Sequence, residues 1–419
     1  MNDILPDEVR RWQRVETVFR ATVERYGFNE IRTPLLEPTE LFVRSVGETT
    51  DIVQKEMFTL DHHGDSLTLR PEGTASAARA YVEHTVSTRE PVTRWYYLGP
   101  MFRAERPQRG RYRQFYQAGC EIFGDPGPAA DAEMIDMLYR FFGALGIGGV
   151  EVLVNSLGSK GTRERYRDLL RDHLTPHAAE LSENARKRLE DNPLRILDSK
   201  NARDQELAAS APPILDILDD SDRAHFDGLR RHLDALGVPY RVDPRLVRGL
   251  DYYTRTLFEL KASTGSLGAQ NALGGGGRYD AMIHELGGPS ANAIGFAIGL
   301  ERVLLAMGES EETAPACCFV APIGERAISR GLVLGRELRD RGVRTEVDGR
   351  GGSVKSMLRR ANALGARVCL LLGDSELDKG VVQVKDLAAH AEEESPLDVA
   401  ADRVAAILAT PAPKHEAPR

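Results

Sequence analysis

Two runs with the composition of β-strands, residues 94–103 and 113–123, are separated by a loop of residues 104–112. The loop contains Pro107 and Gly110, and it also carries several arginines. Two strand-like runs joined by a loop of this kind predict an antiparallel hairpin. The first part of the chain is therefore expected to contain antiparallel β-structure with a strongly basic connection.

The second of these runs places a carboxylate in an otherwise apolar strand. Side chains alternate between the two faces of a strand. One face therefore carries Phe115, Gln117, Gly119 and Glu121, and the other carries Tyr116, Ala118, Cys120 and Ile122, which suit a hydrophobic core. A buried carboxylate requires hydrogen-bond donors or a cation. Glu121 either pairs with Arg103 on the neighbouring run, or it receives a ligand with N–H groups while Arg103 faces an anion. The hairpin alone favours neither interpretation.

Other charged residues in suggestive surroundings occur far from the hairpin. Glu72 lies in LRPEGT, where a strand is expected to turn into a helix that Thr74 caps. Arg248 lies in VRGLDYYTRT, and Arg302 lies in IGLER. The glycine run at 274–277 would let a ligand approach the backbone closely, although most such runs are loops. The combination favours a binding site over a purely structural role.

Composition places the chain among ordinary soluble proteins. Its 419 residues suffice for two or three domains, and its net charge of −8 argues against a protein that coats nucleic acid indiscriminately. Four cysteines without CxxC spacing predict neither a disulfide framework nor a zinc site. The first residues lack an apolar signal segment, and no apolar run approaches the ~20 residues of a membrane span. We therefore expect a reduced, cytoplasmic protein with no membrane segment.

Local patterns predict several elements. Apolar residues recur at steps of three and four over residues 7–26, which predicts an amphipathic helix. Residues 29–47 contain Pro34 and Pro38, each of which disfavours helix at the residue before it, so we expect extended or irregular chain there. Residues 291–307 are rich in small apolar side chains and are expected to form a helix.

The character of the sequence changes along the chain, and these changes predict its domains. Residues 158–240 are more charged and helix-like, which indicates a helical insertion. After the polar linker at 308–316, strands and helices alternate, which predicts a small α/β domain with a mostly parallel sheet. We therefore expect a first domain over residues 1–312, with the insertion, and a second over 313–419.

Several of these stretches resemble the motifs of one enzyme family. FRAERPQRGRYRQFYQAGCEIFG resembles motif 2 of the class II aminoacyl-tRNA synthetases, AIGFAIGLER resembles motif 3, and the segment around Pro34 resembles motif 1. LRPEGT, RGLDYYTRT and GGGGRYD are similar to signatures of the histidyl-tRNA synthetase family, and LRILDSKN fits the insertion of that family. The last domain resembles its anticodon-binding domain. The resemblance covers nearly the whole chain.

The resemblance implies a fold and a reaction. The fold would be the α+β catalytic domain of class II synthetases, with an antiparallel sheet of six or seven strands flanked by helices, followed by an α/β anticodon-binding domain. The protein would be a homodimer with motif 1 at the interface. It would be a histidine–tRNA ligase, which forms histidyl-adenylate and pyrophosphate from histidine and ATP and then transfers the histidyl group to the 3′ end of tRNA(His). ATP would arrive with Mg²⁺.

Two other interpretations compete with this one. The synthetase-like regulatory subunit of ATP phosphoribosyltransferase shares the fold without the activity, but it typically lacks the anticodon-binding domain and several motif residues, which are present here. Another class II synthetase, for threonine, proline or glycine, is a third possibility. The stretches RGLDYYTRT and GGGGRYD argue against it.

The resemblance also implies roles for individual residues around ATP. Arg103 would bind the α-phosphate, because a planar guanidinium can hold two oxygens at once. Arg248 would be the catalytic arginine of the reaction. Arg302 would contact the γ-phosphate end and adenine, and Phe115 would stack on the other face of adenine. Glu105 and Arg111 would bracket the nucleotide.

The histidine and tRNA contacts are implied in the same way. Glu121 would accept a hydrogen bond from the imidazole, beside the hydroxyl of Tyr253. The remaining histidine-binding residues would be Glu72, Gly73, Thr74, Gln117, Tyr252 and Tyr279. Ordinary hydrophobic packing is the competing explanation for the tyrosines. Arg106, Gln108 and Arg109 would contact the acceptor end of tRNA. Lys355 and Arg359 are four residues apart on one helix face and either bind the anticodon stem-loop or simply face solvent.

Overall fold

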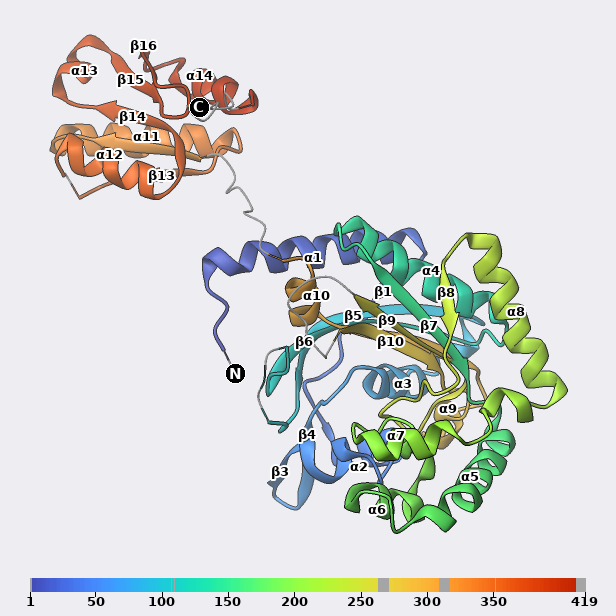
Figure 1. The fold of residues 1–419 in the computed structure, drawn as a ribbon. Helices are drawn as coiled ribbons and strands as arrows, with labels where there is room; N and C mark the ends of the chain where they lie inside the picture. Colours follow the sequence, from blue (N-terminus) through green and yellow to red (C-terminus); the bar gives the residue numbers. More distant parts are fainter. Residues whose placement is uncertain are drawn as a thin grey trace. The chain divides into compact units, whose positions relative to one another are not determined.

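The computed structural model describes residues 2–106, 108, 110–262, 271–308, 317–350 and 352–411. The chain divides into two compact units, Met1–Ser310 and Glu311–Arg419, each with its own sheet (Figure 1).

The first unit is built on an eight-stranded sheet in which the six inner strands are antiparallel. Its strand order is β1 (Asn29–Glu30), β5 (Thr93–Phe102), β6 (Gln114–Phe123), β11 (Ala293–Gly299), β10 (Ala272–Arg278), β9 (Thr254–Ala262), β7 (Val150–Ser156) and β8 (Tyr240–Val242). The short edge strands β1 and β8 pair in parallel with their neighbours. The antiparallel class II sheet expected from the sequence is confirmed, with the edge strands added.

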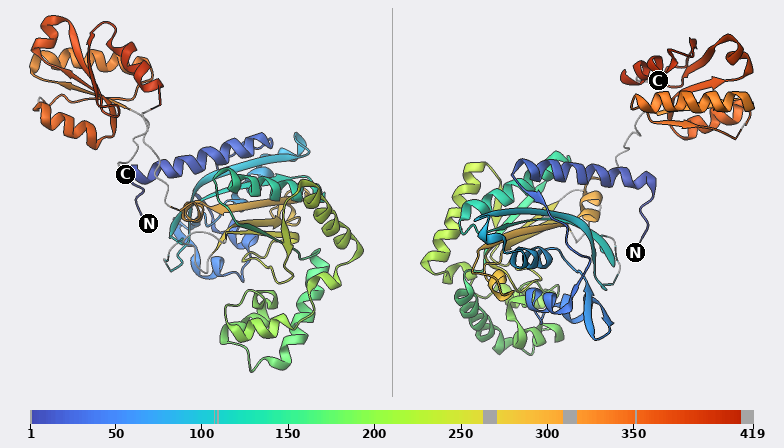
Figure 2. Two further views of the ribbon diagram at one scale, coloured as in Figure 1. Left: turned by 45° about the horizontal axis from the view of Figure 1, so that its top comes forward. Right: turned by 180° about the vertical axis from the view of Figure 1, so that it is seen from behind.

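Helices cover both faces of this sheet (Figure 2). One face packs against α1 (Pro6–Arg25), α4 (Pro128–Ala144), α8 (Asp220–Leu236) and α10 (Leu300–Ala306). The opposite face packs against α3 (Thr74–Glu83), α9 (Met282–Glu285) and α5 (Lys160–Leu174). The alternation of β6 decides which side chains meet which layer. Ala118, Cys120 and Ile122 join the first core, as the sequence predicted, whereas Glu121 faces the other way.

A smaller sheet and the remaining helices complete the first unit. The small sheet has the order β2 (Leu36–Pro38), β4 (Asp65–Leu69) and β3 (Phe58–His62), and α2 (Thr39–Val46) follows β2. Residues between β7 and β8 contain α5, α6 (Glu183–Asp191), α7 (Ala202–Ala209) and α8. No described helix is both long and apolar enough to cross a membrane.

Three local predictions were wrong. The stretch at 291–307 is not one helix, because its first half is strand β11 and only Leu300–Ala306 is helical. Small residues there serve close packing: a Cβ on Gly295 would lie 1.6 Å from a carboxylate oxygen of Glu121. The region at 29–47 contains α2, since Pro38 restricts the residue before it and leaves the following residues free to form a helix.

The third error concerns the start of α3. Thr74 does not cap this helix, because it is already the first helical residue. The carboxylate of Glu72 caps it instead, accepting hydrogen bonds from the backbone N–H groups of Thr74 (2.9 Å) and Ala75 (2.7 Å). The hydroxyl of Thr74 is thereby available to donate to Glu121 at 2.7 Å.

The second unit contains a five-stranded sheet with the order β13 (Thr345–Val347), β12 (Cys317–Pro322), β14 (Ala366–Leu372), β15 (Val381–Asp386) and β16 (Ala391–Pro396). Its helices are α11 (Glu325–Asp340), α12 (Val354–Ala363), α13 (Asp374–Lys379) and α14 (Ala400–Ala409). The sheet is mixed rather than mostly parallel, because β15 and β16 form an antiparallel hairpin beside three parallel strands.

Candidate active site

A pocket of about 420 Å³ opens against the α3 side of the large sheet. It is lined by the start of α3, the β5–β6 hairpin, the segment before β9, strand β10 and the start of α10. Most of the predicted site residues line it: Glu72, Thr74, Arg103, Glu105, Arg111, Phe115, Gln117, Arg248, Tyr252, Tyr253, Tyr279 and Arg302. Residues from five separate segments of the sequence therefore meet in one cavity of the size that small-molecule sites have.

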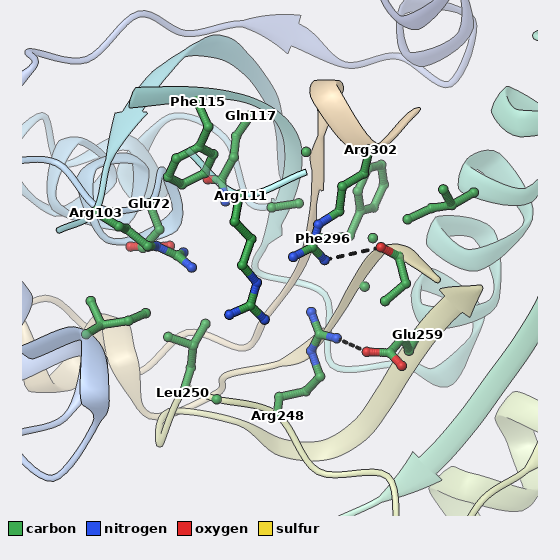
Figure 3. A pocket seen from close by; sticks show the side chains of 18 of the residues that line it. Glu72, Arg103, Arg111, Phe115, Gln117, Arg248, Leu250, Glu259, Phe296 and Arg302 are labelled. Carbon is green, nitrogen blue, oxygen red and sulfur yellow. Dashed lines mark hydrogen bonds and ion pairs between the residues drawn. The ribbon is translucent and has the colours of Figure 1, made fainter. Parts of the chain in front are cut away.

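Four arginines, Arg103, Arg111, Arg248 and Arg302, direct their guanidinium groups toward the centre of the pocket (Figure 3). Two are held by backbone carbonyls. Arg103 donates from Nε to the oxygen of Pro71 at 2.9 Å, and Arg302 donates from Nη1 to the oxygen of Ala272 at 3.2 Å. Backbone acceptors orient a guanidinium without neutralising its charge. Arg103 and Arg302 therefore keep their positive charge for a ligand.

The other two arginines are paired with carboxylates. Arg111 lies 3.0 Å from Glu105, and Arg248 forms an ion pair with Glu259. Burial, and next the positive charge of Arg111, lower the pKa of Arg302. Like charges crowded in a partly buried pocket repel one another, so this arrangement favours an anionic ligand such as a polyphosphate.

The guanidinium of Arg103 lies 5.2 Å from the centre of the Phe115 ring. Phe115 and Gln117 are neighbours on the pocket-facing side of β6. The side-chain oxygen of Gln117 is buried, and it has no hydrogen-bond partner among the described residues. A buried acceptor without a donor is costly. A ligand that supplies an N–H group at this point would satisfy it.

Glu121 lies beneath the pocket and is 0 % exposed. Hydroxyl groups surround its carboxylate: Thr74 donates at 2.7 Å, Tyr97 donates at 3.2 Å, and Tyr279 also donates. Burial raises the pKa of Glu121 to about 8, although these hydrogen bonds favour the charged form. The carboxyl group is thus surrounded by hydroxyl donors, and none of the ion pairs among the described residues includes it. The ion pair with Arg103 does not form, because Arg103 turns toward Pro71 and Phe115.

The hydroxyl of Tyr253, the expected partner of Glu121 around the imidazole, does not itself donate to Glu121 in this structure. Tyr253 lines the pocket and packs against Tyr252 with ring centres 4.6 Å apart, but the hydroxyls that reach Glu121 are those of Tyr97 and Tyr279. Tyr97 was given no role in the sequence analysis. Its ring fills the space over two glycines, since a Cβ on Gly73 would lie 2.2 Å from the ring. A Cβ on Gly119 would lie 2.4 Å from it.

Glu72 is the second buried carboxylate of the site, with 3 % of its surface exposed. Burial raises its pKa, and the backbone N–H groups of Ala75 and Thr74 oppose that shift. Several further pocket residues were not predicted, among them Glu259 on β9, and Asp198 and Lys200. The last two belong to the stretch LRILDSKN, which was noticed only as a mark of the insertion.

Of the predicted tRNA-contacting residues in the first unit, Arg106 and Gln108 do not line this pocket. Arg106 and Gln108 are exposed on the β5–β6 loop, and Arg109 lies outside the described residues. In the second unit, Lys355 and Arg359 are exposed on α12. Several other arginines of this unit are paired with acids, among them Arg350 with Asp348 and Arg360 with Glu346. Part of the basic charge of this unit is therefore neutralised internally.

Comparisons with known proteins find matches for both units of the chain. Residues 1–303 match the family model of histidyl-tRNA synthetase, and residues 317–407 match that of an anticodon binding domain. A curated histidine–tRNA ligase of Sorangium cellulosum is 63 % identical over 414 residues, which cover 99 % of this chain and 96 % of that protein. A histidine–tRNA ligase of a Geobacillus species is 46 % identical over 407 residues and covers 96 % of each chain.

Solved structures agree with these sequence matches. The apo histidyl-tRNA synthetase of S. aureus is 34 % identical, with a TM-score of 0.81 over 97 % of this chain and 98 % of that one. A structure from Bacillus halodurans, described as an ATP phosphoribosyltransferase regulatory subunit/histidyl-tRNA synthetase, is 22 % identical with a TM-score of 0.66. It covers 89 % of this chain and 97 % of its own, and at that identity the likeness concerns the fold alone.

Proposed function

Since the chain belongs to the histidyl-tRNA synthetase family, we infer that it activates histidine with ATP and transfers the histidyl group to tRNA(His). The observation that carries this inference is one pocket lined by four inward-pointing arginines and the buried carboxylate of Glu72, with the buried carboxylate of Glu121 beneath it. The regulatory-subunit alternative has less support, because histidine–tRNA ligases match nearly the full length of the chain and an anticodon-binding family model matches its second unit.

The arginines form the nucleotide half of the site. MgATP is the substrate, and its α-phosphate lies between Arg103 and Arg248. Arg302 contacts the γ-phosphate end and one face of adenine, and Phe115 stacks on the other face. Glu105 and Arg111 bracket the nucleotide. Prepositioned cations of this kind stabilise negative charge as it develops on the transferring phosphorus.

The carboxylates form the amino-acid half. Glu121 accepts a hydrogen bond from an imidazole N–H. The hydroxyl groups that donate to its carboxylate in this structure can rotate, so they can adjust when the ligand donates as well. Glu72, Thr74 and the unpartnered oxygen of Gln117 hold the ammonium group of histidine. Gly73, Tyr252, Tyr253 and Tyr279 complete the wall. A phenylalanine substrate would leave the buried acceptors unsatisfied, which costs ~10⁴-fold or more in discrimination.

Two bond exchanges follow from this placement. The carboxylate of histidine attacks the α-phosphorus, and the bond from that phosphorus to the pyrophosphate oxygen breaks. Arg103 and Arg248 stabilise the pentacoordinate state. The 3′ hydroxyl of tRNA then attacks the histidyl carbonyl carbon, and AMP leaves with the bonding electrons.

The remaining parts of the proposal concern tRNA and assembly. Arg106, Gln108 and Arg109 contact the acceptor end of tRNA, and Lys355 and Arg359 contact the anticodon stem-loop. The protein acts as a homodimer, with the segment around Pro34 at the interface, in the cytoplasm.

Amino-acid-dependent exchange of pyrophosphate into ATP tests the function. Histidine should support exchange, and no exchange with any amino acid would favour the regulatory-subunit alternative. Exchange driven by a different amino acid would indicate another class II synthetase. The variant Arg248→Ala should lose most of the exchange rate. Arg245→Ala is the matched control, because Arg245 is exposed three residues earlier.

A further inference from the structure

The segment that carries Arg248 has little regular structure of its own. Residues 246–253 lie between β8 and β9 and form neither helix nor strand. They carry Arg248, Tyr252 and Tyr253, all of which line the pocket. Backbone groups outside helices and sheets must find partners elsewhere, and those partners fix the conformation of the segment. The position of Arg248 therefore depends on whatever holds this loop.

Helical residues between β7 and β8 supply several of these partners. Arg163 on α5 donates from Nη1 to the carbonyl oxygens of Asp251 and Tyr253, both at 2.7 Å. Arg195 donates from Nη2 to the carbonyl oxygen of Gly249 at 2.8 Å. Two arginines of the insertion thus bind the backbone immediately after Arg248. Neither arginine lines the substrate pocket.

The side chain of Asp251 joins three parts of the first unit. Its Oδ1 accepts a hydrogen bond from Nδ2 of Asn192 at 3.0 Å, and its Oδ2 accepts one from the hydroxyl of Thr49 at 2.8 Å. Its backbone N–H donates to the oxygen of Val46, at the end of α2, at 3.2 Å. Asn192 is 3 % exposed, so its contact with Asp251 is shielded from water. Asp251 is the point where the insertion, the α2 segment and the Arg248 loop meet.

The guanidinium group of Arg248 is held by a separate contact. Its guanidinium pairs with Glu259 on β9, which sets the direction of the side chain but not the position of its backbone (Figure 3). A guanidinium can hold two phosphate oxygens only if it starts from the right place, and small displacements of a catalytic group cost large factors in rate. Both ends of the residue therefore need to be fixed.

We propose that Asp251 is a positioning residue for Arg248, and that Asn192 of the insertion fixes Asp251 for this purpose. The proposal rests on the role of Arg248 under the proposed function. Asp251 contacts no substrate, and it acts by holding the loop so that Arg248 meets the α-phosphate. In this account the insertion takes part in histidine activation itself, before any tRNA is bound.

Single-turnover formation of histidyl-adenylate tests the proposal in the full-length enzyme without tRNA. Asp251→Asn keeps the shape of the side chain and removes its charge, and Asn192→Ala removes the donor from the insertion. Each should lower the rate constant by about 10-fold, since hydrogen bonds to charged groups contribute ~1.5–3 kcal/mol. The KM for histidine should change by less than about threefold. Asn201→Ala is the control, because Asn201 caps α7 within the same insertion. Its rate should equal that of the wild type.

A double mutant separates positioning from a merely structural role. Asp251→Asn should have no further effect in an Arg248→Ala background, because residues that act through one group are not additive. The proposal is overturned if Asp251→Asn and Asn192→Ala both react at the wild-type rate, or if Asp251→Asn slows Arg248→Ala by the same factor as the wild type. If Arg248→Ala itself reacts at the wild-type rate, the role of Arg248 in the proposed function fails instead.

Discussion

Burial raises the pKa of Glu121 to about 8, so above pH 8, where the carboxyl group is ionised, replacing Glu121 with glutamine isolates the effect of one buried negative charge. The two side chains have nearly the same shape, so the pocket keeps its form. The neighbouring hydroxyls of Thr74, Tyr97 and Tyr279 now meet one carbonyl oxygen and one amide group. Hydroxyl groups rotate and accept as well as donate, so these neighbours can adapt. Under the proposed function, the variant loses the charged acceptor for the imidazole N–H of histidine.

The size of the effect follows from the burial of this group. Glu121 is 0 % exposed, so no water replaces the lost acceptor. A hydrogen bond to a charged group contributes ~1.5–3 kcal/mol, and each ~1.4 kcal/mol corresponds to a factor of ten. We therefore expect kcat/KM for histidine to fall by about 10- to 150-fold. The KM for ATP should stay unchanged, because the polar partners of Glu121 are hydroxyls and not the arginines.

The assay is histidine-dependent pyrophosphate exchange at saturating ATP, run above pH 8 so that Glu121 is ionised, with the histidine concentration varied. Glu90→Gln is the matched control, because Glu90 is an exposed carboxylate and its loss should leave kcat/KM unchanged. A Glu121→Gln enzyme whose kcat/KM for histidine stayed within about threefold of the wild type would refute the assignment of this carboxylate to the imidazole.

Three further outcomes follow from the same structure. Burial raises the pKa of Glu121 from 4.5 to about 8, so the folded protein retains a proton that the unfolded chain releases, and this group lowers stability as pH rises between those values. In urea unfolding, Glu121→Gln should gain stability relative to the wild type from pH 5 to pH 8, and a constant difference would contradict the shift. Gly295→Ala places a Cβ 1.6 Å from the carboxylate of Glu121 and should lower the free energy of unfolding by ~1–3 kcal/mol. Gly143→Ala is the control, because a Cβ on Gly143 meets no atom within 4 Å and should not lower the free energy of unfolding. Replacing Lys355 and Arg359 with alanine should weaken tRNA binding and reduce its salt dependence by about two charges without changing pyrophosphate exchange, and an unchanged salt dependence would assign both side chains to solvent.

The sequence was sufficient wherever a local period decided the structure. Strand alternation placed Ala118, Cys120 and Ile122 in the core and turned Glu121 away from it, and the structure confirms this. A period of two is a property of the chain itself, so it survives folding unchanged.

The predictions that failed concerned features that depend on contacts between distant segments. Strand β11 was mistaken for helix, because its small residues are explained only by the side chain of Glu121 that lies against Gly295. The hydrogen bonds from Tyr97 and Tyr279 to Glu121 were not foreseen, because sequence motifs do not show which hydroxyl reaches a given carboxylate. The role of Glu72 as a helix cap depended on the exact first residue of α3, which sequence patterns locate poorly.

The most direct test of the central claim is a crystal structure of the protein soaked with histidine and MgATP. The account predicts the imidazole beside Glu121, the ammonium group near Glu72 and Gln117, and the α-phosphate between Arg103 and Arg248. Histidine or adenylate bound with its imidazole away from Glu121, or a triphosphate bound outside the arginine-lined pocket, would contradict it.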